Sequence, residues 1–231
     1  KFSTSNKRGV FMDQALDLLP ADYWRWYLIA NSPEGSDAAF TWEGFQAAVN
    51  SDLANVLGNF VNRITKYCVA KFDGKVPDGG EPGEAEAWIT AELAERLPRL
   101  IDYYEAMEFR KAAAETRAIW AAGNEYLTKA EPWVKYKSDV DAAAVGVRTG
   151  LNLAALFGIL CLPVIPETGA KILDALGVPD DKRTFQFGDI AALLDALPRG
   201  HAITPPDVLF QKIEDEQVAA WTEQFGGGNQ A

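Results

Sequence analysis

The chain has 231 residues, 48% hydrophobic and 24% charged, which is the balance of a protein with a packed interior. Its net charge of -11 disfavours non-specific binding to nucleic acids, so any RNA contact needs a local basic or aromatic patch. Two isolated cysteines, Cys68 and Cys161, and one histidine, His201, exclude a zinc cluster and a histidine-based nucleophile, and they are typical of the reducing cytoplasm.

Residues 1–40 are predicted to form a small connecting subdomain. Loop-like residues come first, and the aromatic cluster in PADYWRWYLIANSPEG then indicates a helix, with room for a short strand that periodicity would miss. The chain begins at Lys1 without an initiator methionine or an apolar signal core. We therefore expect a piece of a longer polypeptide that is not secreted.

A long amphipathic helix is predicted over residues 41–66. Apolar side chains recur there at intervals of three or four, at Phe45, Val49, Leu53, Leu57, Phe60 and Ile64. The opposite stripe is polar and carries Asp52, Asn55, Asn59, Asn62, Arg63 and Lys66. A solvated face is the simplest interpretation of this stripe, and a ligand-binding face is the alternative.

Further helices are predicted after a loop rich in proline and glycine at residues 73–83. They cover about residues 84–104, 108–129 and 138–160, with a shorter one at 167–176 that ends at Gly177. The apolar stretch 151–165 is shorter than the roughly 20 residues that span a bilayer, so we expect a buried helix and no membrane association. Residues 41–178 should thus form a mainly α, antiparallel bundle.

The tail, residues 179–231, mixes proline breaks with isolated apolar anchors such as Leu209 and Phe210. This pattern is typical of a segment that lies on the surface of another domain.

The first five residues, KFSTS, resemble the KMSKS loop of class I aminoacyl-tRNA synthetases, which stabilises the ATP pyrophosphate during adenylate formation. Lysines, hydroxyls and backbone N–H groups suit a phosphate chain. Lys1, Ser3 and Ser5 match the motif, Phe2 replaces a methionine, and Thr4 replaces the second lysine. Taken alone, a five-residue match favours an ordinary N-terminal loop.

The segment YWRWYLIANSPEGSDAAFTWEGFQAAVNSDLANVLGNFVNRI resembles the region of methionyl-tRNA synthetases that joins the catalytic core to the anticodon-binding bundle. The resemblance implies that Asn59 and Arg63 contact anticodon bases, with Asn62 as a further candidate. Residues four apart project from one helical face, so both side chains can reach one ligand. Asparagine offers a donor and an acceptor to a base edge, and arginine offers a planar fork.

The segment KAEPWVKYK resembles the short motif of this family whose aromatic residue stacks on the first anticodon base. The resemblance assigns that role to Trp133, with Pro132 as a possible contact, and Lys135 and Lys137 would add positive potential. Pro132 at a helix start restrains the backbone and would hold the ring as a rigid platform. The alternative is that Trp133 packs in the core.

The resemblance extends through PPDVLFQKIEDEQV, which is similar to the family's tail that returns to the catalytic domain. It implies the anticodon-binding part of a monomeric methionine-tRNA ligase whose partners are methionine tRNA, L-methionine and ATP with Mg2+. Zinc would be confined to the N-terminal part of such an enzyme, and this fragment alone would be inactive. The remaining alternatives are a synthetase for leucine, isoleucine, valine or cysteine, and a non-catalytic helical interaction module.

Overall fold

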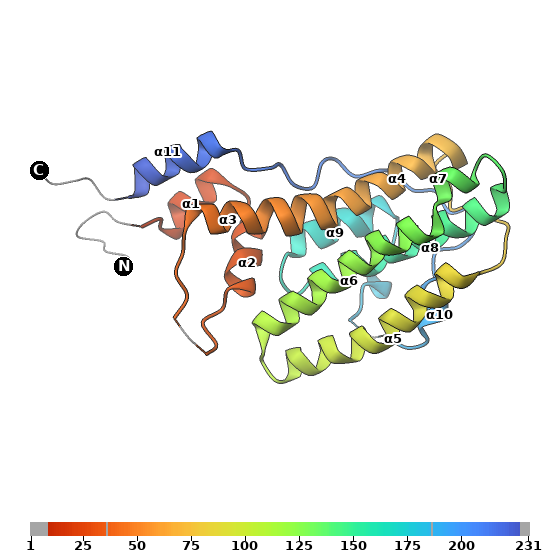
Figure 1. Cartoon of the computed structure of the whole chain (residues 1–231), viewed down its shortest axis with the longest axis horizontal. Helices are drawn as coiled ribbons and strands as arrows, with labels where there is room; N and C mark the ends of the chain where they lie inside the picture. Colours follow the sequence, from red (N-terminus) through yellow and green to blue (C-terminus); the bar gives the residue numbers. More distant parts are fainter. Residues whose placement is uncertain (1–8, 36, 186, 227–231) are drawn as a thin grey trace, which may run out of the picture.

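The computed structural model describes residues 9–35, 37–185 and 187–226, and the regular elements in these ranges are helical (Figure 1). An isolated antiparallel bridge joins Lys75 to Ala202. The helices are α1 (Met12–Leu18), α2 (Ala21–Ala30), α3 (Trp42–Ala48), η1 (Val49–Gly58), α4 (Asn59–Phe72), α5 (Glu84–Glu105), α6 (Phe109–Ala130), α7 (Pro132–Lys135), α8 (Val140–Cys161), α9 (Pro166–Ala175), η2 (Asp180–Lys182), α10 (Ile190–Leu193) and α11 (Asp215–Phe225).

One continuous helical run is formed by α3, η1 and α4 (Figure 1). It starts at Thr41, whose side chain accepts a hydrogen bond from the Gly44 backbone N–H. The predicted helix is confirmed, but it continues to Phe72 and its middle, η1, is a π-helix with wider turns. At the end of η1, the Asn59 N–H bonds to the carbonyl of Ala54, five residues earlier.

The bundle is completed by α5, α6 and α8, which run alternately up and down beside α4 (Figure 1). Glycines allow the helices to approach closely. A Cβ on Gly123 of α6 would lie 2.5 Å from the Phe157 ring of α8, and one on Gly150 of α8 would lie 2.7 Å from Ile64 of α4. The predicted mainly α, antiparallel bundle is confirmed.

The centre of the bundle is α8. Among the described residues it is the one helix long and apolar enough to cross a membrane, with a mean hydropathy of 1.6, and its apolar window is entirely buried by the protein. The prediction of a buried helix in this region is therefore confirmed. After α9, Gly177 has φ +62°, the left-handed conformation predicted for it.

The connecting segment before α3 contains α1 and α2, and in its described residues the short strand that the sequence left room for is not present. Trp26 of α2 packs on Trp120 of α6 with 4.7 Å between ring centroids. Asp22 accepts hydrogen bonds from the backbone N–H and the hydroxyl of Thr168 at the start of α9. The connecting segment and the bundle thus share one hydrophobic core.

The tail runs along the α3–η1–α4 helix and ends in α11 beside α3 (Figure 1). Phe210 is buried against Tyr23, and Trp221 of α11 packs on Trp42 with 5.1 Å between centroids. The Gly9 N–H donates to the Phe225 carbonyl, so the two ends of the described chain meet. The apolar anchors of the tail therefore contact this chain's own helices.

Candidate nucleic-acid interface

Two of the predicted site residues meet directly at the end of the bundle where α4 and α7 lie side by side. The guanidinium carbon of Arg63 lies 4.4 Å from the centroid of the Trp133 ring, within the range of a cation–π contact. Arg63 is exposed and Trp133 is half-buried. The pair is therefore accessible from solvent, and the two side chains come from separate helices.

The backbone before Trp133 explains how the ring is held. Glu131 adopts a left-handed conformation, φ 45° and ψ 49°, which ends α6, and Pro132 opens α7 at its first position. Pro132 is buried against α8, where a Cβ on Gly146 would lie only 3.2 Å from the Pro132 Cβ. Because residue 146 is a glycine, the ring of Pro132 can pack closely against α8. The buried Pro132 in turn fixes the position of Trp133, the next residue.

Tyr67, one turn after Arg63 on α4, supports Trp133 from the side. The two rings are at right angles with centroids 5.9 Å apart, and the Tyr67 hydroxyl donates to the Pro132 carbonyl at 3.4 Å. Desolvation by burial, and secondly the charge of Tyr136, raise the pKa of Tyr67. The phenol therefore stays protonated at neutral pH and remains a donor.

The two asparagines predicted to belong to the site lie on the exposed face of α4. Asn59 precedes Arg63 by one turn, and Asn62 is its neighbour. In the described part of the chain, neither side-chain amide forms a hydrogen bond. Each can therefore offer both a donor and an acceptor to a ligand.

Several cations lie near the Arg63–Trp133 pair. Lys71 lies over the Tyr136 ring at 5.3 Å. Within the ranges that the structure describes, several cations near the Arg63–Trp133 pair form no ion pair with a carboxylate: Arg63, Lys66, Lys71, Lys135 and Lys137. These cations are therefore available to an anionic ligand, although the protein has a net charge of -11.

The structure thus brings Arg63 and Trp133 into contact, with Asn59 one turn before Arg63 on α4 and the buried Pro132 next to Trp133. The supporting residue Tyr67 was missed by sequence reasoning, although its spacing of four from Arg63 puts it on the same face. Another set of predicted residues, the KMSKS-like Lys1, Phe2, Ser3, Thr4 and Ser5, lies outside the described residues.

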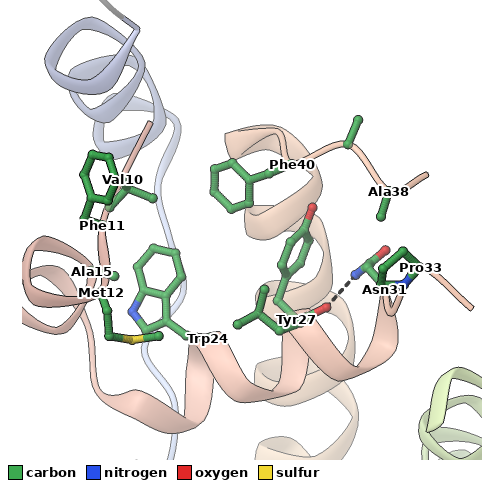
Figure 2. Close-up of a pocket in the computed structure, with 12 residues that line it drawn as sticks. Val10, Phe11, Met12, Ala15, Trp24, Tyr27, Asn31, Pro33, Ala38 and Phe40 are labelled. Atoms are coloured by element: carbon green, nitrogen blue, oxygen red, sulfur yellow. Dashed lines mark hydrogen bonds between the residues drawn. The ribbon is translucent and has the colours of Figure 1, made fainter. Parts of the chain in front are cut away.

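A separate pocket of about 350 Å³ lies in the connecting segment. Figure 2 shows Trp24 and Tyr27 of α2 facing it, with the Asn31 amide bonded to the Tyr27 carbonyl. The lining is almost wholly apolar, and nearby Met12 and Leu28 are 62% and 53% exposed. Such a surface offers nothing to a phosphate and suits contact with another part of a protein.

The helical bundle and its matches with known proteins place the chain in the class of anticodon-binding bundles of class I tRNA synthetases. A family model for the anticodon binding domain of methionyl tRNA ligase matches residues 76–230, and one for class I tRNA synthetases (M) matches residues 1–65. The chain therefore belongs to the methionyl-tRNA ligase family.

Relatives and solved structures agree with this family. The chain is 77% identical over its whole length to the methionine–tRNA ligase of Hyphomonas neptunium and 78% identical to that of Maricaulis maris. Apo methionyl-tRNA synthetase of Mycobacterium tuberculosis covers 89% of the chain with a TM-score of 0.79 and 28% identity. Its complex with methionyl-adenylate covers 85% with a TM-score of 0.76. The chain spans only part of these proteins. It corresponds to 40% of the Hyphomonas ligase and 41% of the Maricaulis ligase, and to 41% of the apo and 39% of the adenylate-bound Mycobacterium chain.

Proposed function

We propose that the protein to which this chain belongs is a methionine-tRNA ligase, and that this portion reads the anticodon of methionine tRNA. The observation that carries the proposal is the Arg63–Trp133 pair, with Asn59 one turn away on the same helical face. An exposed arginine over a half-buried tryptophan offers both a stacking surface and a donor fork to unpaired bases.

In this proposal each side chain has a separate task. Trp133 supplies the platform on which the first anticodon base stacks, and its position is set by Pro132 and Tyr67. Asn59 and Arg63 form hydrogen bonds with base edges, and Asn62 adds a contact at the rim. Because the side-chain amides of Asn59 and Asn62 form no hydrogen bond in the described part of the chain, binding costs no internal hydrogen bond of theirs.

The chemistry of charging is assigned to the parts outside the described residues. Lys1, Phe2, Ser3, Thr4 and Ser5 would meet the pyrophosphate of Mg2+-bound ATP, and L-methionine would bind in the catalytic domain. Zinc is likewise assigned only to that domain. We place the enzyme in the cytoplasm as a monomer that does not associate with membranes.

We also propose a division of the chain into a connecting subdomain (1–40), the anticodon-binding bundle (41–178) and a C-terminal tail (179–231). The apolar pocket between α1 and α2 is the surface on which the catalytic part packs. Two observations support this assignment: the exposed Met12 and Leu28 beside the pocket, and the fact that the chain spans only 40% of its relative's length.

The proposal is tested by binding the chain to RNA stem-loops that differ only in the anticodon. The methionine anticodon should bind at least tenfold more tightly than leucine, isoleucine, valine or cysteine anticodons. Preference for one of those anticodons would identify a synthetase for another amino acid, and no RNA binding would favour a helical interaction module. In the complete enzyme, the same anticodon changes should lower the rate of methionine charging.

A further inference from the structure

A groove of about 530 Å³ lies beside the proposed anticodon site, between the polar face of η1–α4 and the tail. One wall carries the helical side chains Asn55, Asn59, Asn62 and Lys66. The other wall is formed by tail residues 206–210 and Lys212. Asn59 belongs to both places, since it lines the groove and precedes Arg63 by one turn. A strand of RNA that reaches the Arg63–Trp133 pair would therefore continue into this groove.

The tail wall is fixed in place before any ligand binds. Phe210 is buried against Tyr23, with 5.3 Å between ring centroids, and the Gln211 N–H donates to the Tyr23 hydroxyl. Asn50 of η1 makes a reciprocal pair of hydrogen bonds with the backbone of Ile213, both at 2.8 Å. The groove is therefore preorganised, which reduces the entropy lost on binding.

The side chains of the groove suit a sugar–phosphate chain. Lys66 and Lys212 are exposed and form no ion pair within the described residues, so both ammonium groups are available to phosphates. The asparagine amides can bond to ribose hydroxyls, and Val208, 73% exposed, offers an apolar contact. Asp207 is the one carboxylate that lines the groove. Because Lys66 and Lys212 also line it, the groove has a net positive charge.

We propose that this groove binds the sugar–phosphate backbone of the anticodon-loop nucleotides next to the three bases that are read. Lys66 and Lys212 hold phosphates, and the C-terminal tail is thereby part of the RNA-binding surface. The proposal rests on the proposed function, because it requires the anticodon loop at the Arg63–Trp133 pair. Its contribution is independent of base sequence, since phosphates carry no sequence information.

The test replaces each lysine with glutamine, as Lys66→Gln and Lys212→Gln, in the chain described above. Affinity for the methionine stem-loop and for one with a swapped anticodon should fall by the same factor, roughly fivefold each. The slope of log K against log salt should become shallower by about 0.7 per lost phosphate contact. Lys171→Gln on α9 is the matched control, because Lys171 is also exposed without an ion pair but lies outside the groove.

A second measurement uses stem-loops in which one linkage beside the anticodon is an uncharged methylphosphonate. At the linkage that Lys212 contacts, the RNA change and Lys212→Gln should be non-additive, because both remove the same interaction. Additive effects at every linkage would overturn the groove proposal. If Trp133→Ala weakened binding while both lysine variants bound normally, the groove proposal would be overturned and the proposed function would stand. If the unaltered chain bound no stem-loop, both proposals would fail.

Discussion

Replacing Trp133 with alanine should weaken binding to the methionine anticodon stem-loop by about ten- to one-hundredfold. Stacking of a base on an aromatic ring contributes about 1 to 3 kcal/mol, and each 1.4 kcal/mol is tenfold in affinity. The variant also loses the contact that holds Arg63 over the ring at 4.4 Å, which is worth about 0.5 to 1 kcal/mol at an exposed site. Because Arg63 makes this contact in the unbound protein as well, its loss adds no separate term to binding, and the stacking energy sets the expected range.

The measurement is a fluorescence anisotropy titration at fixed salt, with circular dichroism to verify that helical content is unchanged. Trp88→Ala is a matched control, because Trp88 is also half-buried and also lies under a cation, with Lys129 at 4.8 Å from its ring. Trp88 belongs to α5 and contacts Lys129 of α6 rather than Arg63, so its loss should leave RNA affinity within twofold. Trp133→Phe should retain part of the affinity, since a smaller ring still stacks.

Two results would refute this reasoning. If Trp133→Ala bound the stem-loop as tightly as the unaltered chain, the ring would have no stacking role. If Trp88→Ala and Trp133→Ala lost affinity equally, the loss would reflect general destabilisation of the bundle. Neither result is compatible with a base seated against Trp133.

Arg63→Lys should keep the charge but lower discrimination between anticodons by roughly tenfold, because a lysine lacks the planar fork; unchanged discrimination in competition binding would contradict this. Gly123→Ala should lower the free energy of unfolding in urea by about 1–3 kcal/mol, because its Cβ would lie 2.5 Å from Phe157, whereas Gly188→Ala, with nothing within 4 Å, should be neutral. Burial raises the pKa of the Cys68 thiol to about 11. The stability that the buried, protonated thiol contributes is therefore fully present below about pH 8.5 and is lost as the pH rises through about 11. The stability advantage over Cys68→Ala should shrink across that window, and a constant difference would refute the pKa assignment.

The helices could be predicted from sequence because each has an apolar face that the bundle buries. The π-helical middle of the long helix was missed, although the sequence carries a signal for it. Phe45, Val49, Leu53 and Leu57 are spaced by four, and all four are fully buried. An α-helix turns every 3.6 residues, so such spacing drifts around its axis, and wider turns keep these side chains on one face.

The candidate site was predictable only in part, for a similar reason. Spacing on α4 places Asn59 and Arg63 together, but the approach of Trp133 depends on the turn at Glu131 and on Gly146 of another helix. The groove wall formed by the tail depends on contacts such as Asn50 with Ile213, which are far apart in the chain. No local pattern encodes such contacts, because Asn50 and Ile213, for example, are 163 residues apart in the sequence.

The distribution of ion pairs reconciles an acidic chain with the proposed binding of RNA. Along α5 and α6, the cations Arg96 and Arg99 are paired with the buried Glu115, and Arg117 is paired with Asp52. Such pairs leave little positive field for a distant phosphate, while the excess of carboxylates repels it over about a Debye length, ~10 Å. Within the described residues, the cations around Arg63 have no such partners, so attraction appears only at short range. A nucleic acid with no unpaired base to stack on Trp133 would meet the repulsion without the compensating stacking, and selectivity for unpaired bases follows from that difference.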